Sequence, residues 1–233
     1  MSRPERLRHT LVVVLTLGTG AMDAVGFLHL GGAFSSVMTG NMVLLGLSAA
    51  GADWGRAILV GIAIAGYVAG VVVGAHLAGR ASATDRVWPG RVTTALLVEG
   101  LLLVVLSAAW LLSGPTRSGG FDQFMITLSS IAFGIQSSAV QRFGVSGLSS
   151  TYLTGTLTTI VAGFVARRRF REQVPGLLIL LTLIAGAAAG YVVSALVPAL
   201  VPVVLVGPVA AVVCAALVIQ WEDERIMIET SRG

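Results

Sequence analysis

Three ionisable side chains lie within or beside stretches that are otherwise apolar, and they are the residues of this sequence best placed to do chemistry. Asp23 and Glu99 each lie in such a stretch, and Arg142 follows a third. An ionisable group at membrane depth is costly, so it is a candidate for ion or proton handling by default. We therefore predict proton or ion coupling through Asp23, Glu99 and Arg142. Two alternatives stay open: Asp23 pairs with Arg142, or Glu99 is a buried carboxyl that is bonded to backbone or lies near an interface.

A second set of polar residues belongs to a stretch that occurs twice, 115 positions apart. The first copy runs Phe34-Ser-Ser-Val-Met-Thr-Gly-Asn41 and the second runs Ser149-Ser-Thr-Tyr-Leu-Thr-Gly-Thr156. The shift is close to half of the 233 residues, which indicates duplication of a whole unit. Asp23 corresponds to Ser138 in this register. We predict a single membrane domain, 1–233, with one repeat at about 10–113 and the other at about 121–220.

The composition is that of a membrane protein. Hydrophobic residues make up 55% of the chain and charged residues only 11%, and the mean hydropathy is +0.90. All 15 basic residues are arginine, and they fall between the apolar stretches, so membrane orientation explains them better than nucleic-acid binding does. The one cysteine excludes an internal disulfide and a cysteine-based metal site.

The apolar stretches predict six full spans and two short helices. The spans are expected at about 10–29, 56–79, 92–113, 121–141, 174–197 and 200–220. Gly/Ser-rich breaks at 30–36 and 142–149 precede short helices at 36–51 and 150–166, which are too short to cross a bilayer about 30 Å thick. Small residues at four-residue spacing predict close helix packing: Gly66, Gly70, Gly74, Gly186, Gly190 and Ser194.

The arginines favour short helices that turn back rather than cross. With six crossings and a cytoplasmic N-terminus, all arginines except Arg56 and Arg117 lie on the cytoplasmic side. With eight crossings, more of the arginines lie on the outer side. Three crossings per repeat invert the second copy relative to the first. The fold predicted is therefore all-α and integral to the membrane, with six transmembrane helices, two re-entrant half-helices and two inverted-topology repeats.

The two breaks are the predicted binding site. Ser35 or Ser36, and Ser150 or Thr151, are expected to cap the short helices, whose N-termini then present backbone N–H groups to a wet cavity at the midplane. Such an end suits an anion or the negative end of a dipole. The predicted substrate-binding residues are Ser35, Ser36, Thr39, Gly40, Asn41, Gln136, Ser150, Thr151, Thr154, Gly155 and Thr156.

At the duplicated stretch the chain resembles a known family. Asp23-Ala-Val-Gly-Phe27 and Phe34-Ser-Ser-Val-Met-Thr-Gly-Asn-Met-Val-Leu-Leu-Gly46 are similar to the signature of the YoaK-like proteins, and Gly134-Ile-Gln136 is similar to part of their second signature. The resemblance implies an uncharacterised, six-span protein of the bacterial inner membrane, and it names no substrate. Ser137 stands where that family often has Asn, so an amide contact there is in doubt.

We interpret the chain as a secondary transporter of a small solute, with anions among the candidates, and with proton coupling through Asp23 or Glu99. A channel of the same fold and a non-transporting scaffold or partner subunit are the alternatives. No complete catalytic set can be assembled, so we do not expect an enzyme, and no cofactor or metal is expected. The expected partners are the lipid bilayer and the solute, not nucleic acid, and a homodimer is compatible with the small size. Both termini are expected in the cytoplasm.

Overall fold

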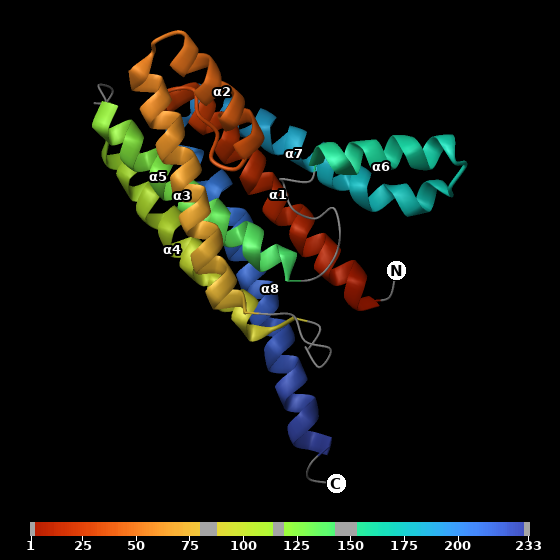
Figure 1. Cartoon of the computed structure of the whole chain (residues 1–233). Helices are drawn as coiled ribbons and strands as arrows, with labels where there is room; N and C mark the ends of the chain where they lie inside the picture. Colours follow the sequence, from red (N-terminus) through yellow and green to blue (C-terminus); the bar gives the residue numbers. More distant parts are fainter. Residues whose placement is uncertain (1–2, 80–87, 114–118, 143–152, 231–233) are drawn as a thin grey trace.

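The computed structural model describes residues 3–79, 88–113, 119–142 and 153–230, and within these ranges it is helical apart from short connections (Figure 1). Two of the α-helices described there have 13 residues and the others have 23 or more. The elements are α1 (Arg3–His29), α2 (Met38–Ala50), α3 (Trp54–Ala78), α4 (Gly90–Leu112), α5 (Gly119–Gln141), α6 (Leu153–Val165), α7 (Phe170–Leu196), the 3-10 turn η2 (Pro198–Leu200) and α8 (Val201–Thr230).

Among the described residues, five segments are long and apolar enough to cross a membrane. They lie in α1, α3, α4 and α7 and at Pro198–Trp221, which includes most of α8. α5 has a sufficient length of 23 residues but is not among them, because Ser129, Ser130, Gln136 and Ser137 interrupt its apolar sequence. These side chains are buried, and α5 packs between α3 and α4. A helix covered by other helices can carry polar groups that lipid would not accept.

The small residues predicted to pack closely do so. On α3, a Cβ at Gly74 would come within 2.8 Å of the Cα of Ile135, and one at Gly70 would meet the carbonyl of Ile131, both on α5. On α7, a Cβ at Gly190 would lie 2.5 Å from the carbonyl oxygen of Ala21 on α1. Glycine at these positions lets the helix backbones touch, as is typical of helix pairs in lipid.

Helices at equivalent positions in the two halves pack against equivalent helices. α3 packs most extensively against α5, and α7 packs most extensively against α1. In the same way α4 packs against α5 and α8 packs against α1, while α4 and α8 contact each other. The pattern of contacts is the same when α1, α2, α3 and α4 are exchanged with α5, α6, α7 and α8 in that order. A duplicated unit would produce such a pattern.

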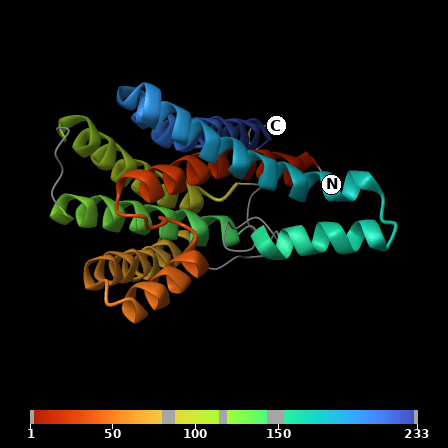
Figure 2. The same cartoon turned by 90° about the horizontal axis from the view of Figure 1, so that it is seen from above.

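The two short helices lie on opposite sides of the molecule. α2 packs on α3 and α6 packs on α7, and Figure 2 shows α2 and α6 extending from the middle in opposite directions. The α6–α7 hairpin projects beyond the other helices in both views (Figures 1 and 2). The sequence also predicts that Thr39-Gly40 and Thr154-Gly155 meet near the membrane centre, and this contact stays a prediction.

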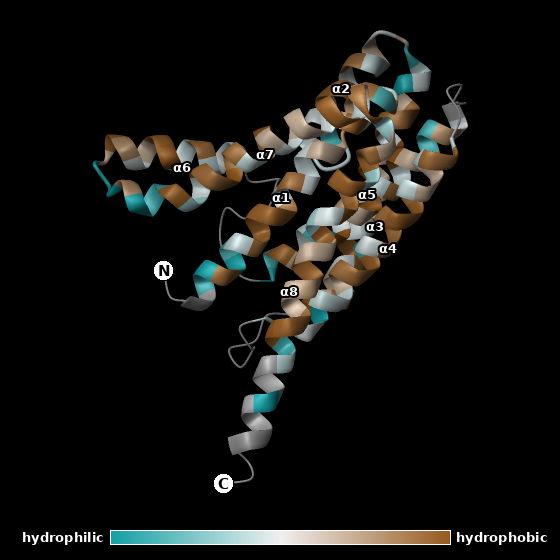
Figure 3. Cartoon of the chain, turned by 180° about the vertical axis from the view of Figure 1, so that it is seen from behind, coloured by the Kyte–Doolittle hydropathy of each residue, from teal (hydrophilic) through white to brown (hydrophobic). Residues whose placement is uncertain are grey.

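Apolar residues predominate along the helices, and polar residues lie at several helix ends (Figure 3). Large apolar side chains such as Leu101, Leu157 and Val203 are more than half exposed. Polar residues gather at the turn between α6 and α7 and at the start of α1 (Figure 3). A surface of this kind suits surrounding lipid, with the polar ends in the headgroup region.

The structure changes some of the expected boundaries. α8 continues to Thr230, so the charged segment after residue 220 is helical rather than a separate tail. The cap of α2 is Val37, which makes no side-chain cap hydrogen bond, so the expectation of a Ser35 or Ser36 N-cap is wrong. The second expected break and its caps, Ser150 and Thr151, lie outside the described residues.

Candidate functional site

Residues 30–37 form a break between α1 and α2 that folds back along α1. Gly31 and Gly32 both have a φ of +78°, a left-handed conformation that glycine adopts without steric cost. The Gly32 carbonyl accepts a 3.4 Å hydrogen bond from Nη2 of Arg56, which places this turn beside the start of α3. Farther along, Ser35 and Ser36 reach Asp23, almost two turns before the end of α1. The chain therefore returns into the helix bundle before α2 begins.

Asp23 holds the break through hydrogen bonds to Ser35 and Ser36, an arrangement that we call the Asp23 clamp. Its Oδ1 accepts hydrogen bonds of 2.8 Å from the backbone N–H of both Ser35 and Ser36, and its Oδ2 accepts one of 2.5 Å from the Ser36 hydroxyl. All three residues are buried. Arg142 is not among these partners, so the predicted alternative of an Asp23–Arg142 pair is wrong. The carboxylate supplies the backbone donors with the acceptor that a Ser cap was expected to provide.

Asn41 braces the break from the α2 side. Its Oδ1 accepts a 2.9 Å hydrogen bond from the N–H of Phe34, and its Nδ2 donates one of 2.7 Å to the carbonyl of Phe34. The Asn41 side chain is fully buried. It therefore replaces a backbone partner for both polar groups of Phe34, which the irregular loop leaves without a helical one.

A hydroxyl pair joins the break to the second half of the chain. Ser35 Oγ and Ser129 Oγ on α5 lie 2.8 Å apart, and both residues are fully buried. Ser129 also donates to the carbonyl of Ile126. Ser129 was not predicted as a site residue, and its only signal in the sequence is a pair of serines inside an apolar stretch.

A second polar cluster crosses three helices in the bundle interior. Thr19 on α1 donates a 2.9 Å hydrogen bond to Oε1 of Gln136 on α5, and Nε2 of Gln136 donates one of 2.7 Å to Oε1 of Glu99 on α4. Glu99 is fully buried, and its Oε2 has no hydrogen-bond partner among the described residues. The expected alternative of a carboxyl held by backbone is wrong, because the partner is the Gln136 side chain.

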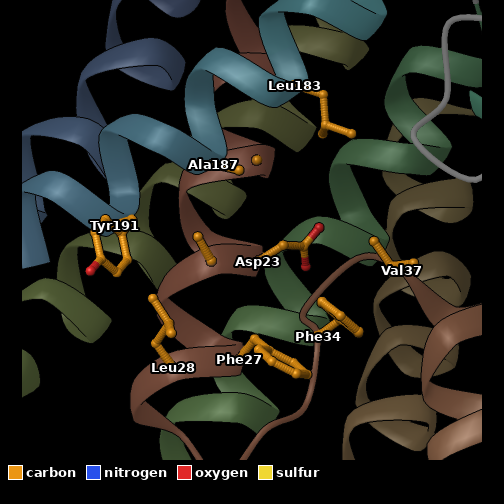
Figure 4. Close-up of a pocket in the computed structure, with 10 residues that line it drawn as sticks. Asp23, Phe27, Leu28, Phe34, Val37, Leu183, Ala187 and Tyr191 are labelled. Atoms are coloured by element: carbon orange, nitrogen blue, oxygen red, sulfur yellow. The ribbon is translucent and has the colours of Figure 1, made fainter.

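A groove adjoins the Asp23 clamp. It is lined by residues of α1, the break and α7, and its volume is about 390 Å³. The lining is apolar apart from the carboxyl of Asp23 and the hydroxyl of Tyr191, and the side chain of Asp23 points towards the break segment that carries Phe34 and Val37 (Figure 4). This cavity, rather than an open helix end, is the space available to a small molecule beside the first break.

The predicted site residues thus fall into separate groups. Asp23, Ser35, Ser36 and Asn41 come together at the break, and Glu99 and Gln136 come together in the bundle. Thr39, Thr154 and Gly155 are exposed, whereas Thr156 is buried beside Gly176 of α7. Gly40 packs against the Phe34 ring, and Arg142 follows the end of α5. A substrate-binding role for these residues stays a prediction.

Known proteins similar to this chain are themselves described as membrane proteins or as uncharacterised. The family model for a protein of unknown function, DUF1275, matches residues 11–218. The UPF0700 transmembrane protein YoaK of Bacillus subtilis (strain 168) is 36% identical over 171 residues, which cover 71% of each chain. No solved structure matches the chain. The range matched by the family model includes the break, Asp23 and Glu99.

Proposed function

This chain belongs to the DUF1275 family and is a multi-pass membrane protein, and we propose that it is a secondary transporter of a small solute. In this proposal α1, α3, α4, α5, α7 and α8 cross the membrane, and α2 and α6 are re-entrant. Each half then has three crossings, so the halves are inverted repeats. In this proposal the membrane is the bacterial inner membrane, and both termini lie in the cytoplasm. The excess of arginine on one side of the six crossings supports this orientation.

The observation that carries the proposal is the buried break before α2. Irregular backbone at membrane depth is tolerated only where protein or a cavity covers it, and transporters use such broken helices as binding sites. Here the backbone at Ser35 and Ser36 is covered by Asp23 of α1 and is linked through Ser35 to Ser129 of α5. A broken segment that contacts both halves of the chain is placed to respond when the halves move relative to each other.

The expected preference for an anionic solute does not carry over to this site. The N–H groups of Ser35 and Ser36, which an anion would use, already donate to the carboxylate of Asp23. A second negative charge next to Asp23 would be repelled in the low dielectric of the bundle. We therefore place the solute in the groove beside the clamp, and we assign Asp23 to holding the break.

Proton coupling falls to Glu99 in this proposal. A lone carboxylate is costly to bury, and Oε2 of Glu99 has no hydrogen-bond partner among the described residues, so a bound proton removes the charge at little structural cost. Gln136 and Thr19 connect this carboxyl to α5 and α1. The cluster therefore ties the protonation of Glu99 to helices of both halves.

Uptake by proteoliposomes with and without an imposed pH gradient tests the proposal. We expect wild-type uptake of at least one solute from a broad panel to depend on the gradient. Glu99→Gln keeps an oxygen acceptor for Gln136 but binds no proton, so its uptake should lose the dependence on the gradient. Ser107→Ala, which changes a buried polar residue elsewhere on α4, is the matched control and should keep the dependence.

Two results would contradict the proposal. Fast flux of the solute that no gradient drives would indicate a channel. Absence of flux for every solute in the panel, by a protein shown to be folded, would favour a scaffold or partner subunit.

A further inference from the structure

We propose that the groove beside Asp23 binds an organic cation with an apolar or aromatic body. The inference deepens the proposed function, on which it rests, by giving the chemical class of the solute. It stands on the geometry of one cavity and on the charge of Asp23, the one carboxylate among the described residues that line it.

The groove has the size and surface of a site for a small apolar molecule. Its volume of about 390 Å³ lies within the range of about 300–1,000 Å³ that is typical of ligand pockets. Leu28 and Tyr191 lie on one side of it and Phe34 and Val37 on the other (Figure 4). Apolar walls contribute affinity for an apolar body through burial of its surface.

Aromatic rings give this wall a preference for positive charge. Phe27 and Phe34 are stacked with their ring centroids 5.0 Å apart and an interplanar angle of 17°. The faces of aromatic rings carry negative electrostatic potential, and a cation placed over one is attracted to it. Tyr191 supplies a third ring from α7.

The carboxylate of Asp23 gives the same preference more strongly. Its hydrogen bonds to Ser35 and Ser36 come from neutral donors, which stabilise the charge without cancelling it. The described lining contains no basic side chain. In a low-dielectric environment charges interact over several ångströms, so a cation in the groove is attracted without touching the buried carboxylate.

Access to the groove also fits an amphipathic solute. Phe27 is 43% exposed, Leu28 48% and Tyr191 57%. These exposed side chains border the groove on the outer surface of α1 and α7, so it opens sideways. An organic cation that has partitioned into the bilayer interface can enter from the side.

Two ions of nearly the same size and shape but opposite charge test this inference: tetraphenylphosphonium and tetraphenylborate. Binding of each to the purified full-length protein in lipid nanodiscs is measured by equilibrium dialysis, with empty nanodiscs subtracted. We expect the phosphonium to bind at least tenfold more tightly than the borate. Asp23→Asn should reduce phosphonium affinity about tenfold or more and shrink the difference between the ions.

Two further variants keep the test decisive if Asp23→Asn does not fold. Phe27→Leu and Tyr191→Leu keep apolar volume but remove a ring, and each should weaken phosphonium binding about two- to tenfold. Phe124→Leu on α5, at a position 48% exposed and outside the groove, should leave binding unchanged. Equal binding of the two ions, preference for the borate, or phosphonium binding that neither ring removal weakens would overturn the inference.

The outcome is separable from that of the proposed function. Dialysis without a gradient measures binding alone, so selective phosphonium binding without any flux would contradict transport and leave the cation site standing. Gradient-driven uptake of another solute by a protein that does not select the phosphonium would overturn the cation site and leave transport standing.

Discussion

The two halves of this chain share their packing but differ at the start of their short helices. In the first half, Asp23 and Asn41 hold the break with hydrogen bonds to its backbone. Their counterparts in the second half are Ser138, which donates a 2.8 Å hydrogen bond to the carbonyl of Val71 on α3, and Thr156, which is buried beside α7. The equivalent residues therefore perform different tasks.

The sequence predicts that the two halves are repeats, and this difference indicates which features of the predicted repeat can diverge. Helix packing through glycine is retained in both halves, because any side chain there would collide with backbone. The polar clamp uses one carboxylate and one amide, and the equivalent positions in the second half hold Ser138 and Thr156 instead. We infer that packing is a shared scaffold and that the clamp is specific to the first half.

Glycine substitutions should give a large effect, and an equal one in both halves. Gly70→Ala and Gly190→Ala each place a Cβ against a backbone carbonyl that cannot move aside, so each should destabilise by about 3 kcal/mol or more. Gly61→Ala, where no atom lies within 4 Å of the added Cβ, is the control. Thermal unfolding followed by size-exclusion chromatography in detergent measures this, and a large effect in one half only would break the equivalence.

Removal of the Asp23 carboxylate should lower the stability more than removal of the equivalent Ser138 hydroxyl in the second half. Asp23→Ala leaves three buried donors of Ser35 and Ser36 unpaired, at about 1–3 kcal/mol each, whereas Ser138→Ala loses one hydrogen bond worth about 1 kcal/mol. The same unfolding measurement should show a drop in Tm on the order of 10 °C for the first variant. Similar small losses in both variants would mean that the clamp does not hold the break.

Removal of the bracing amide should have the next largest effect. Asn41→Ala deprives the partly buried N–H and carbonyl of Phe34 of their partners, and we expect a loss of about 2 kcal/mol in the free energy of unfolding. Thr156→Ala at the equivalent position should cost about 1 kcal/mol or less. If the order of the two variants were reversed, the bracing role assigned to Asn41 would be wrong.

The hydroxyl pair between Ser35 and Ser129 should give the smallest effect. A double-mutant cycle with Ser35→Ala and Ser129→Ala should report a coupling free energy of about 0.5–1.5 kcal/mol, the usual net contribution of one buried hydrogen bond. The pair of Ser35→Ala with Ser107→Ala, on α4, serves as the control and should be additive. A coupling free energy indistinguishable from that of the control would mean that the Ser35–Ser129 hydrogen bond does not link the break to α5.

The helices could be predicted from the sequence because their signals are local. Long apolar stretches gave α3, α4 and α5 to within two residues at each end, and the Gly/Ser-rich stretch gave the break at 30–36. Membrane helices satisfy their own backbone groups, so length and apolarity suffice to find them. The length of α8 was underestimated because its last turns are polar. A helix can continue with polar residues once it has left the lipid.

The side-chain partners could not be predicted because they depend on how the helices pack. Asp23 and Glu99 stood out as ionisable groups in apolar sequence. That Asp23 would bond to Ser35 and Ser36 follows only from the way the break folds back along α1. Thr19 was missed, although it lies four residues before Asp23, because a threonine in a helix usually bonds to its own backbone.

The central claim is that α2 turns back instead of crossing the membrane, and labelling of single cysteines tests it most directly. In a Cys214→Ser background, His29→Cys and Trp54→Cys flank the break and α2, and Gly90→Cys begins α4; all three positions are exposed. We predict that a membrane-impermeant maleimide added to intact spheroplasts labels the first two positions and reaches Gly90→Cys only after permeabilisation. Labelling of His29→Cys and Trp54→Cys from opposite sides would show that α2 crosses, and would contradict the account.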